Sequence, residues 1–277
     1  AVNPLIRLIP APLVRFFAKP YVAGDSLAKT MKVVERLWRD RGLMSTLDLL
    51  AEDIVEPAQV ERNIDTYLQM VEAVANSDLP RESRPTLSLK PSSYTTSPLH
   101  EGGDADGSLP ALERIAAHAR ERSVSVSVDM EGHHWTDFTI EALRRLHAAG
   151  HTHVGAVLQT RLHRTESDLD SLPPGIRVRL VIGIYQESSD IAQTDKPAMK
   201  DRMLEFAERL LARGHYVEFA THDIAYVRLT GSSSLLILDV SSPDNPTTLG
   251  KFAYEPWAYG TEKYRMDVAG QHVFLEH

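Results

Sequence analysis

Short apolar runs rich in β-branched residues alternate with longer segments of helical periodicity between about Ser45 and His222. This alternation predicts βα units whose strands form a parallel sheet. The expected strands are Ser45–Leu50, Thr86–Lys90, Val124–Asp129, Val154–Gln159, Val178–Tyr185 and Tyr216–Ala220. The expected helices, with apolar residues three and four positions apart, are Pro57–Ala75, Leu109–Arg122, Thr139–Ala149 and Lys200–Arg213.

The order of these elements predicts an α/β fold. Gly150 and Gly214 each follow an expected helix and lead into the next strand, where a helix commonly ends in the left-handed conformation. The run Val-Ser-Val-Ser-Val at 124–128 alternates as barrel strands do. We therefore expect an incomplete or distorted (β/α)₈ TIM-type barrel of about six βα units. A doubly wound open sheet is the competing arrangement, but no Gly-x-Gly-x-x-Gly follows a strand.

Composition narrows the function classes. The chain has 277 residues, of which 43% are hydrophobic and 25% charged, as in an ordinary globular protein. Thirty basic against 38 acidic residues give a net charge of −8, which argues against binding nucleic acid through phosphate neutralisation. Cysteine is absent, so thiol chemistry and cysteine metal sites are excluded, and the cytoplasm is the expected location. His151 and His153 precede a strand, so we expect surface histidines and no metal site.

The first 24 residues form a basic segment. They contain Arg7, Arg15 and Lys19 but no acidic residue, and four prolines interrupt their apolar positions. These interruptions argue against a signal peptide or a membrane span. We expect an arm that packs on the domain, and the alternative is a basic amphipathic arm in peripheral contact with anionic lipid.

Polar residues stand at the ends of four expected strands: Lys90, Asp129, Gln159 and the pair Thr221 and His222. The carboxyl ends of barrel strands meet at one mouth, where barrel enzymes build their active sites. One such residue alone is more simply explained as a helix cap, whereas four together predict a small-molecule pocket. Arg179 supports this interpretation, because arginine within a buried strand is costly unless it is paired or binds an anionic ligand.

Six motifs in this region resemble monofunctional bacterial proline dehydrogenases, and the resemblance extends from about Ala18 to Asp223. They occur in the order and at the spacing of that family. The motifs are Ser-Thr-Leu-Asp-Leu-Leu-Ala-Glu (45–52), Leu-Ser-Leu-Lys-Pro-Ser (87–92), Val-Asp-Met-Glu (128–131), Val-Leu-Gln-Thr-Arg-Leu-His-Arg (157–164), Arg-Leu-Val-Ile-Gly-Ile-Tyr (179–185) and Phe-Ala-Thr-His-Asp (219–223). The resemblance implies FAD as cofactor, oxidation of L-proline to 1-pyrroline-5-carboxylate, and a membrane quinone as electron acceptor.

The resemblance also implies roles for particular residues. Lys90 and Asp129 would form an ion pair under the substrate, and Tyr185 would pack against the proline ring. Asp129 and Arg179 are the expected catalytic residues, with Arg179 close to the reactive edge of the isoalloxazine. A cation at that edge stabilises the negative charge that develops as the flavin accepts a hydride. The residues expected to hold FAD are Met130, Gln159, Arg179, Ile182, Gly183, Ile184, Thr221 and His222.

Two features depart from the family pattern. Ile182 and Ile184 replace the lysine and alanine of its Arg-Leu-Val-Lys-Gly-Ala-Tyr motif, which removes one cation from the surroundings of the cofactor. Residues 224–277 do not contain the motif Tyr-x-x-Arg-Arg-x-x-Glu, whose arginines clamp the substrate carboxylate in the family. Bidentate recognition by arginine supplies orientation and affinity, so we expect weakened FAD binding and reduced proline turnover.

The sequence after Asp223 resembles a β-propeller repeat rich in Leu-Val-Ile-Val-Asp, with antiparallel strands joined by a Gly-Ser turn. We expect three parts: an arm and helix (1–44), the barrel (45–223) and a short antiparallel β tail (224–277). Six parallel strands leave an exposed sheet edge, which favours docking of the tail, homo-oligomerisation or aggregation. The alternative function is a noncatalytic fusion whose β tail mediates partner contacts.

Overall fold

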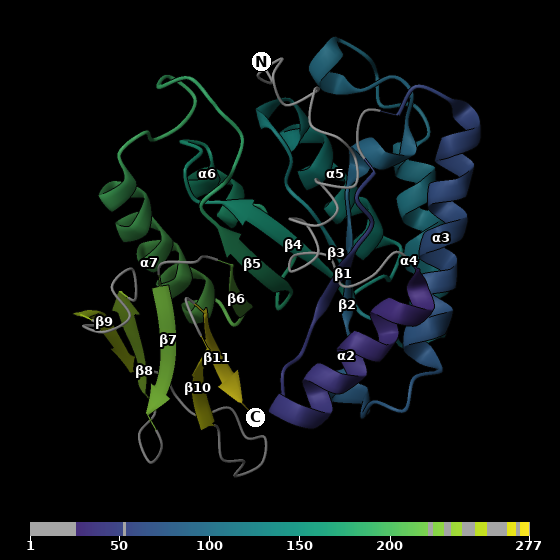
Figure 1. The fold of residues 1–277 in the computed structure, drawn as a ribbon. Helices are drawn as coiled ribbons and strands as arrows, with labels where there is room; N and C mark the ends of the chain where they lie inside the picture. The colour runs from purple at the N-terminus through teal and green to yellow at the C-terminus, as the bar shows by residue number, and fades with distance from the viewer. Residues whose placement is uncertain are drawn as a thin grey trace, which may run out of the picture.

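The structure, a computed structural model, describes residues 26–51 and 54–220, and the backbone of five strands between Ile224 and Glu276. Six parallel strands form one sheet in sequence order, and Figure 1 shows this sheet curling into a half-barrel. The α/β class and the incomplete barrel of six units are therefore confirmed. The strands are β1 (Thr46–Asp48), β2 (Thr86–Leu89), β3 (Val126–Val128), β4 (Val154–Gln159), β5 (Arg177–Val181) and β6 (Tyr216–Ala220).

Helices follow the strands and cover the outer side of the curl (Figure 1). Helix α3 has the predicted bounds. Proline stands at its first helical position, where an N–H would have no partner within the helix. The α-helices are α2 (Leu27–Arg41), α3 (Pro57–Ala75), α4 (Ser108–Glu121), α5 (Thr136–Ala148), α6 (Thr165–Asp170) and α7 (Lys196–Ala212). Among the described residues, the short 3₁₀ turns are η2 (Arg81–Ser83), η3 (Pro91–Tyr94), η4 (Leu99–Glu101) and η5 (His133–Trp135). Within the described residues, no helix has the length and apolarity needed to cross a membrane.

The outward face of the sheet is apolar and forms the core with the helices. Leu87 of β2, Val126 of β3 and Val178 of β5 are fully buried on this face. Leu158 and Leu180 point to the same side of β4 and β5. They belong to one cluster with apolar residues of the helices α3, α4, α5 and α7. Burying a side chain of this size contributes roughly 1.5–3 kcal/mol, so this layer stabilises the curl of the sheet.

Two helices end at the predicted glycines. Gly150 and Gly214 have φ of 86° and 77°, and the residues after them donate to the carbonyls of Leu146 and Leu210. These are Schellman ends, in which left-handed backbone satisfies carbonyls that the helix leaves unpaired. Helix α4 ends in the same way at Ser123, a non-glycine residue with φ of 56°.

The strand predicted over Val178–Tyr185 is too long. β5 stops at Val181, because Gly183 turns the chain away from the sheet at φ of 107°. Ile184 and Tyr185 consequently lie on the loop that leads to α7, at the carboxyl end of the sheet. The first and third predicted strands also shorten, to Thr46–Asp48 and Val126–Val128.

The C-terminal strands do not extend the six-stranded sheet. β7 (Ile224–Leu229), β8 (Ser234–Asp239) and β9 (Thr247–Ala253) form an antiparallel sheet, and β10 (Arg265–Ala269) pairs with β11 (His272–Glu276). The interpretation of this tail as a propeller repeat stays a prediction. Thr221 and His222 lie outside the described residues, as do Arg7, Arg15 and Lys19 of the N-terminal arm.

Candidate functional site

The inward face of the half-barrel carries polar residues where the outward face carries valine and leucine. The strand register pairs Asp48 with Ser88, Ser88 with Ser127, and Arg179 with Glu218. Side chains two residues apart on a strand share a face, so Lys90 and Asp129 continue this face beyond the ends of β2 and β3. The curl therefore collects charged groups at the carboxyl ends of its strands.

The first group, here called the carboxylate cluster, consists of Asp48, Tyr67, Ser88, Lys90 and Asp129. Lys90 Nζ lies 2.6 Å from Asp48 Oδ2, and the Ser88 hydroxyl donates to Asp129 Oδ1. The Tyr67 hydroxyl, from α3, donates to the Ser88 carbonyl at 2.5 Å. Lys90 thus pairs with Asp48, which ends the neighbouring strand on the same face, and its positive charge also acts on Asp129. The expected Lys90–Asp129 ion pair stays a prediction.

Asp129 is held in an environment that favours its neutral form. Burial raises the pKa of this carboxyl, and the negative charge of Asp48 raises it further. The hydrogen bond from Ser88 and the positive charges of Arg179 and Lys90 act in the opposite direction without cancelling the effect of burial. A carboxyl with a perturbed pKa at the mouth of a barrel is a candidate for contact with a ligand.

The second group, the arginine cluster, consists of Arg177, Arg179 and Glu218 on β5 and β6. Glu218 accepts from Arg179 Nε at 3.1 Å and lies 3.3 Å from Arg177 Nε. Arg179 Nη2 also donates to Thr46 Oγ1 at 3.1 Å, which links β5 to β1 across the inside of the curl. These bonds use two of the five N–H donors of the Arg179 guanidinium, so donors remain for a ligand.

Gly155 makes room for the arginine cluster. A Cβ at this position would lie 3.2 Å from Arg177 Nε and 2.9 Å from the Arg177 carbonyl oxygen. The guanidinium of Arg177 passes over the glycine and donates to the Val126 carbonyl at 2.9 Å and to Ser127 Oγ at 3.1 Å. Burial lowers the pKa of Arg177, and the nearby charge of Glu218 opposes that shift.

At the carboxyl ends of the strands, the side chain of Gln159 lies against the backbone of Gly183. Gln159 Nε2 donates to the carbonyls of Met130 and Glu131 at 3.1 and 2.8 Å. Its Oε1 atom is buried and has no hydrogen-bond partner among the described residues. A Cβ on Gly183 would lie 2.3 Å from this oxygen, so only glycine fits here. A buried acceptor without a partner is costly, and a ligand with an N–H donor would offset that cost.

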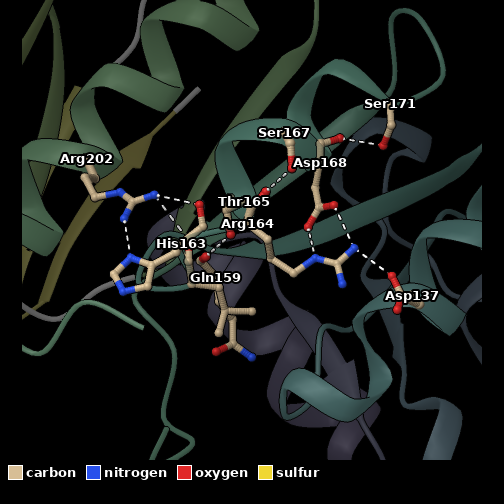
Figure 2. Close-up of polar contacts among 10 residues, drawn as sticks. Asp137, Gln159, His163, Arg164, Thr165, Ser167, Asp168, Ser171 and Arg202 are labelled. Carbon is tan, nitrogen blue, oxygen red and sulfur yellow. Dashed lines mark hydrogen bonds and ion pairs between the residues drawn. The ribbon is translucent and has the colours of Figure 1, made fainter. Parts of the chain in front are cut away.

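The loop after β4 is held in place by hydrogen bonds that Figure 2 shows. Thr165 Oγ1 donates to the Gln159 carbonyl at 2.6 Å, which fixes the end of the strand. Arg164 forms a two-pronged contact with Asp168, at 2.9 and 3.0 Å, and lies 2.8 Å from Asp137 of α5. The backbone around Gln159 is therefore anchored to two helices.

Helix α7 also holds this loop. Arg202 Nη2 donates to the carbonyls of Leu162 and His163, at 3.3 and 3.4 Å (Figure 2). His163 Nε2 lies 3.0 Å from the Ser189 carbonyl, and Leu162 forms an isolated bridge with Ala192. The loops after β4 and β5 therefore act as one unit beside Gln159 and Gly183.

The structure brings together only part of the predicted site. Lys90, Asp129, Arg179, Gln159 and Gly183 lie on or beside the inward face, and Met130 is buried next to Asp129. The ring of Tyr185 lies beside Gly132, since a Cβ on that glycine would be 3.8 Å from Tyr185 Cδ1. Ile182 packs against the core, whereas Ile184 is 89% exposed.

Sequence reasoning missed Asp48, Tyr67, Ser88, Glu131 and Glu218. All but Tyr67 carry a signal in the sequence, because each lies two positions from a predicted site residue or on the same face of a neighbouring strand. Glu131 is buried at 4% exposure and accepts from the backbone N–H of Ser92 at 2.9 Å and from the Ser92 hydroxyl. Within the residues that the structure describes, no group of three or more His, Cys, Asp or Glu side chains is arranged to hold a metal ion.

The fold is that of an incomplete (β/α) barrel with polar residues gathered at the carboxyl ends of its strands. The pattern of the proline dehydrogenase family matches residues 30–230, so the chain belongs to that family. A proline dehydrogenase of Deinococcus radiodurans is 35% identical over 213 residues, which cover 74% of this chain and 65% of the relative. Proline dehydrogenase 1 of Bacillus subtilis is 29% identical over 219 residues, covering 78% of this chain and 68% of the relative.

Solved structures support the fold. The crystal structure of proline utilization A from Bdellovibrio bacteriovorus, inactivated by N-propargylglycine, superimposes with a TM-score of 0.66 at 20% identity. The match covers 76% of this chain and 26% of that one. The Bradyrhizobium japonicum protein of the same name gives a TM-score of 0.59, with 79% of this chain covered. The chain thus spans about two thirds of the Deinococcus relative and a quarter of these larger proteins.

Proposed function

We propose that this chain is a flavin-dependent proline dehydrogenase, which oxidises L-proline to 1-pyrroline-5-carboxylate with FAD as cofactor. Membership of the family supports the substrate and the reaction class. The observation that carries the proposal is the unpartnered Gln159 Oε1 beside Gly183, next to the arginine and carboxylate clusters. This arrangement offers one fixed acceptor, cations and a buried carboxyl at a single mouth.

The residues present fit a flavin. The pyrimidine edge of an isoalloxazine has an N–H donor, which Gln159 Oε1 would accept, and carbonyl oxygens, which the remaining Arg179 donors would bind. When bound, FAD supplies a hydride acceptor, and a nearby arginine stabilises the charge that it gains. The proposed cofactor-binding set is Met130, Gln159, Arg179, Ile182, Gly183, Ile184, Thr221 and His222.

The carboxylate cluster suits the other reactant. Lys90 would bind the proline carboxylate, Asp129 would accept a hydrogen bond from the ring nitrogen, and Tyr185 would pack against the ring. Holding nitrogen and carboxylate at two fixed points orients the ring carbon beside nitrogen, from which the hydride leaves. Asp48 fixes the Lys90 ammonium at 2.6 Å, so it competes with the substrate carboxylate for that cation.

The remaining parts of the proposal concern electron transfer and assembly. A membrane quinone would accept the electrons, and the basic arm with Arg7, Arg15 and Lys19 would hold a cytoplasmic protein peripherally at the membrane. Residues 1–44, 45–223 and 224–277 would form an arm with a helix, a barrel and a propeller-repeat tail. The exposed edge of β6, where Tyr216 is 61% exposed, would be covered by this tail or by a second copy of the chain.

A noncatalytic role is the second candidate. It is favoured by one observation, that the strands from Ile224 onward form sheets of their own and do not continue the six-stranded sheet. In that case the tail would bind a partner and the mouth would stay without a cofactor.

The test is an absorbance spectrum of purified protein in the flavin region, followed by anaerobic addition of L-proline. Bleaching of bound flavin is the expected result. Bound flavin that proline does not bleach would place a defect on the substrate side. Protein that neither retains FAD nor takes it up when added would overturn the proposal in favour of the noncatalytic role.

A further inference from the structure

Tyr185 is the aromatic residue of the loop after β5, and two other loops contact this loop around it. Its ring lies beside Gly132, which follows β3, because a Cβ on this glycine would be 3.8 Å from Tyr185 Cδ1. Its carbonyl accepts from Arg161 Nη1, on the loop after β4, at 2.7 Å. Two residues further on, Glu187 contacts His133. The orientation of Tyr185 is therefore set by contacts outside its own loop.

The contact between Glu187 and His133 uses both carboxylate oxygens. Glu187 Oε1 accepts the backbone N–H of His133 at 2.9 Å, and Oε2 lies 2.5 Å from His133 Nδ1. The Glu187 side chain is only 6% exposed, whereas that of His133 is 31% exposed. A buried carboxylate is expensive to keep unless its hydrogen bonds are made, so this pair holds the two loops at a fixed separation.

Arg161 supplies the contact from the third loop. Its Nη1 atom also lies 3.4 Å from the Gly183 carbonyl, so one guanidinium spans the backbone on both sides of Ile184. A Cβ on Gly183 would lie 2.9 Å from Arg161 Cδ, which shows how closely the side chain covers this turn. Backbone bonds of this kind resist rotation of the segment that carries the Tyr185 ring.

We propose that Glu187 and Arg161 are positioning residues that fix the ring of Tyr185 as one wall of the substrate site and thereby determine which ring-shaped substrates fit. The inference rests on the proposed function for the identity of the ligand, but the contacts themselves do not depend on it. Neither residue needs to touch the substrate, because each acts through the backbone or through His133. The ring of His134 lies beside that of His133, with centroids 3.8 Å apart and an interplanar angle of 37°.

The first experiment measures the order of the Tyr185 ring without any ligand. The nine tyrosines are replaced by 3-fluorotyrosine, and the ¹⁹F resonance that disappears in Tyr185→Phe is assigned to residue 185. Glu187→Ala should shift and broaden this resonance, and Glu187→Gln, which keeps an acceptor for the His133 N–H, should have a smaller effect. Asp190→Asn, an exposed carboxylate on the same loop, is the matched control and should leave the resonance unchanged.

The second experiment asks whether the wall acts on the ligand. The probe is tetrahydrofuran-2-carboxylate, a proline analogue with oxygen in place of the amine, titrated into the FAD-loaded protein and followed by the flavin spectrum. Glu187→Ala should weaken binding about tenfold in the natural background and less than twofold in a Tyr185→Leu background. Such coupling in a double-mutant cycle shows that Glu187 acts through Tyr185. Arg161→Met should behave in the same way.

The outcomes separate the two proposals. An unchanged ¹⁹F resonance in Glu187→Ala, or an equal loss of affinity in both backgrounds, overturns the positioning role. Absence of flavin and analogue binding in the natural protein overturns the proposed function, while the ¹⁹F result still decides whether the three loops hold the Tyr185 ring.

Discussion

The two faces of the six-stranded sheet are held by different kinds of interaction. On the outward face, Leu87, Val126 and Leu180 are buried without polar atoms and depend only on close packing against helices. On the inward face, Asp48, Arg179 and their neighbours satisfy one another through ion pairs and hydrogen bonds. The outward face stabilises the sheet, and the inward face provides the polar groups available to a ligand. Substitutions on the two faces should therefore fail in different assays.

The largest expected effect is on the outward face. Leu158 is 1% exposed and belongs to the main core cluster, so Leu158→Ala removes packing and leaves a cavity. We expect a loss of about 3 kcal/mol in the free energy of unfolding, measured by urea denaturation. In the fraction that remains folded, the dissociation constant of FAD should change less than twofold.

Arg179→Met is the matched substitution on the inward face. It keeps an unbranched side chain but removes the guanidinium, while Glu218 retains its contact with Arg177. Stability should fall by about 1 kcal/mol or less, because the pair is partly exposed, and FAD affinity should fall at least tenfold. If both variants lowered stability and FAD affinity in proportion, the inference that the outward face determines stability and the inward face determines binding would be wrong.

Gly183→Ala should lower both the stability of the protein and its affinity for FAD. Its φ of 107° disfavours any Cβ, and the new methyl would lie 2.3 Å from Gln159 Oε1. We expect a loss of about 2 kcal/mol from backbone strain, with displacement of Gln159 and loss of FAD binding. Thermal denaturation and flavin fluorescence measure the two effects. Gly175→Ala is the control, since that glycine also has positive φ but nothing lies within 4 Å of its Cβ position. It should show strain without loss of FAD binding.

The outward face is the part of the fold that the sequence predicts well. Apolar periodicity located the six strands and four of the helices, because each of those helices packs an apolar stripe on the sheet. The inward face was predicted only as a list of strand ends. Periodicity cannot show which polar partners meet across the curl, so it does not predict the pair of Lys90 with Asp48. The apolar run does not reveal the end of β5, because only the positive φ of Gly183 ends that strand.

The two ends of the sheet should also respond to pH in opposite directions. At the amino ends, burial lowers the pKa of His151 and His215, and it lowers the pKa of His153 to about 4. These histidines are more easily protonated in the unfolded chain, so their contribution to stability is present above about pH 6.5 and is lost as the pH falls toward 4. At the carboxyl ends, Asp129 changes stability with pH in the opposite direction. Its raised pKa contributes stability below the ordinary aspartate pKa, and this contribution is lost as the pH rises through the raised value.

Urea denaturation at several pH values tests this contrast. His153→Gln should reduce the loss of stability between pH 6.5 and 4 by about 1 kcal/mol, a value discounted for the partial exposure of the ring. Asp129→Asn should instead flatten the decline in stability that occurs as the pH rises from the ordinary aspartate pKa through the raised value. His134→Gln, at an exposed histidine, serves as the control. The same slope in His153→Gln and the natural protein would show that the amino ends do not set acid stability.

The smallest expected effect is a change in stability at the end of the sheet opposite to the candidate site. Ser123 ends α4 with φ of 56°, in the position where α5 and α7 have Gly150 and Gly214. Ser123→Gly relieves the strain of a left-handed serine while keeping the bond from the Val124 N–H to the Ala119 carbonyl at 2.8 Å. We expect a gain of about 0.5–1 kcal/mol in the free energy of unfolding, because the relief of strain exceeds the added flexibility of the unfolded chain. FAD affinity should stay constant, since Ser123 precedes β3 at the end opposite to Asp129. A more stable protein with altered FAD affinity would show that the two ends of the sheet are coupled.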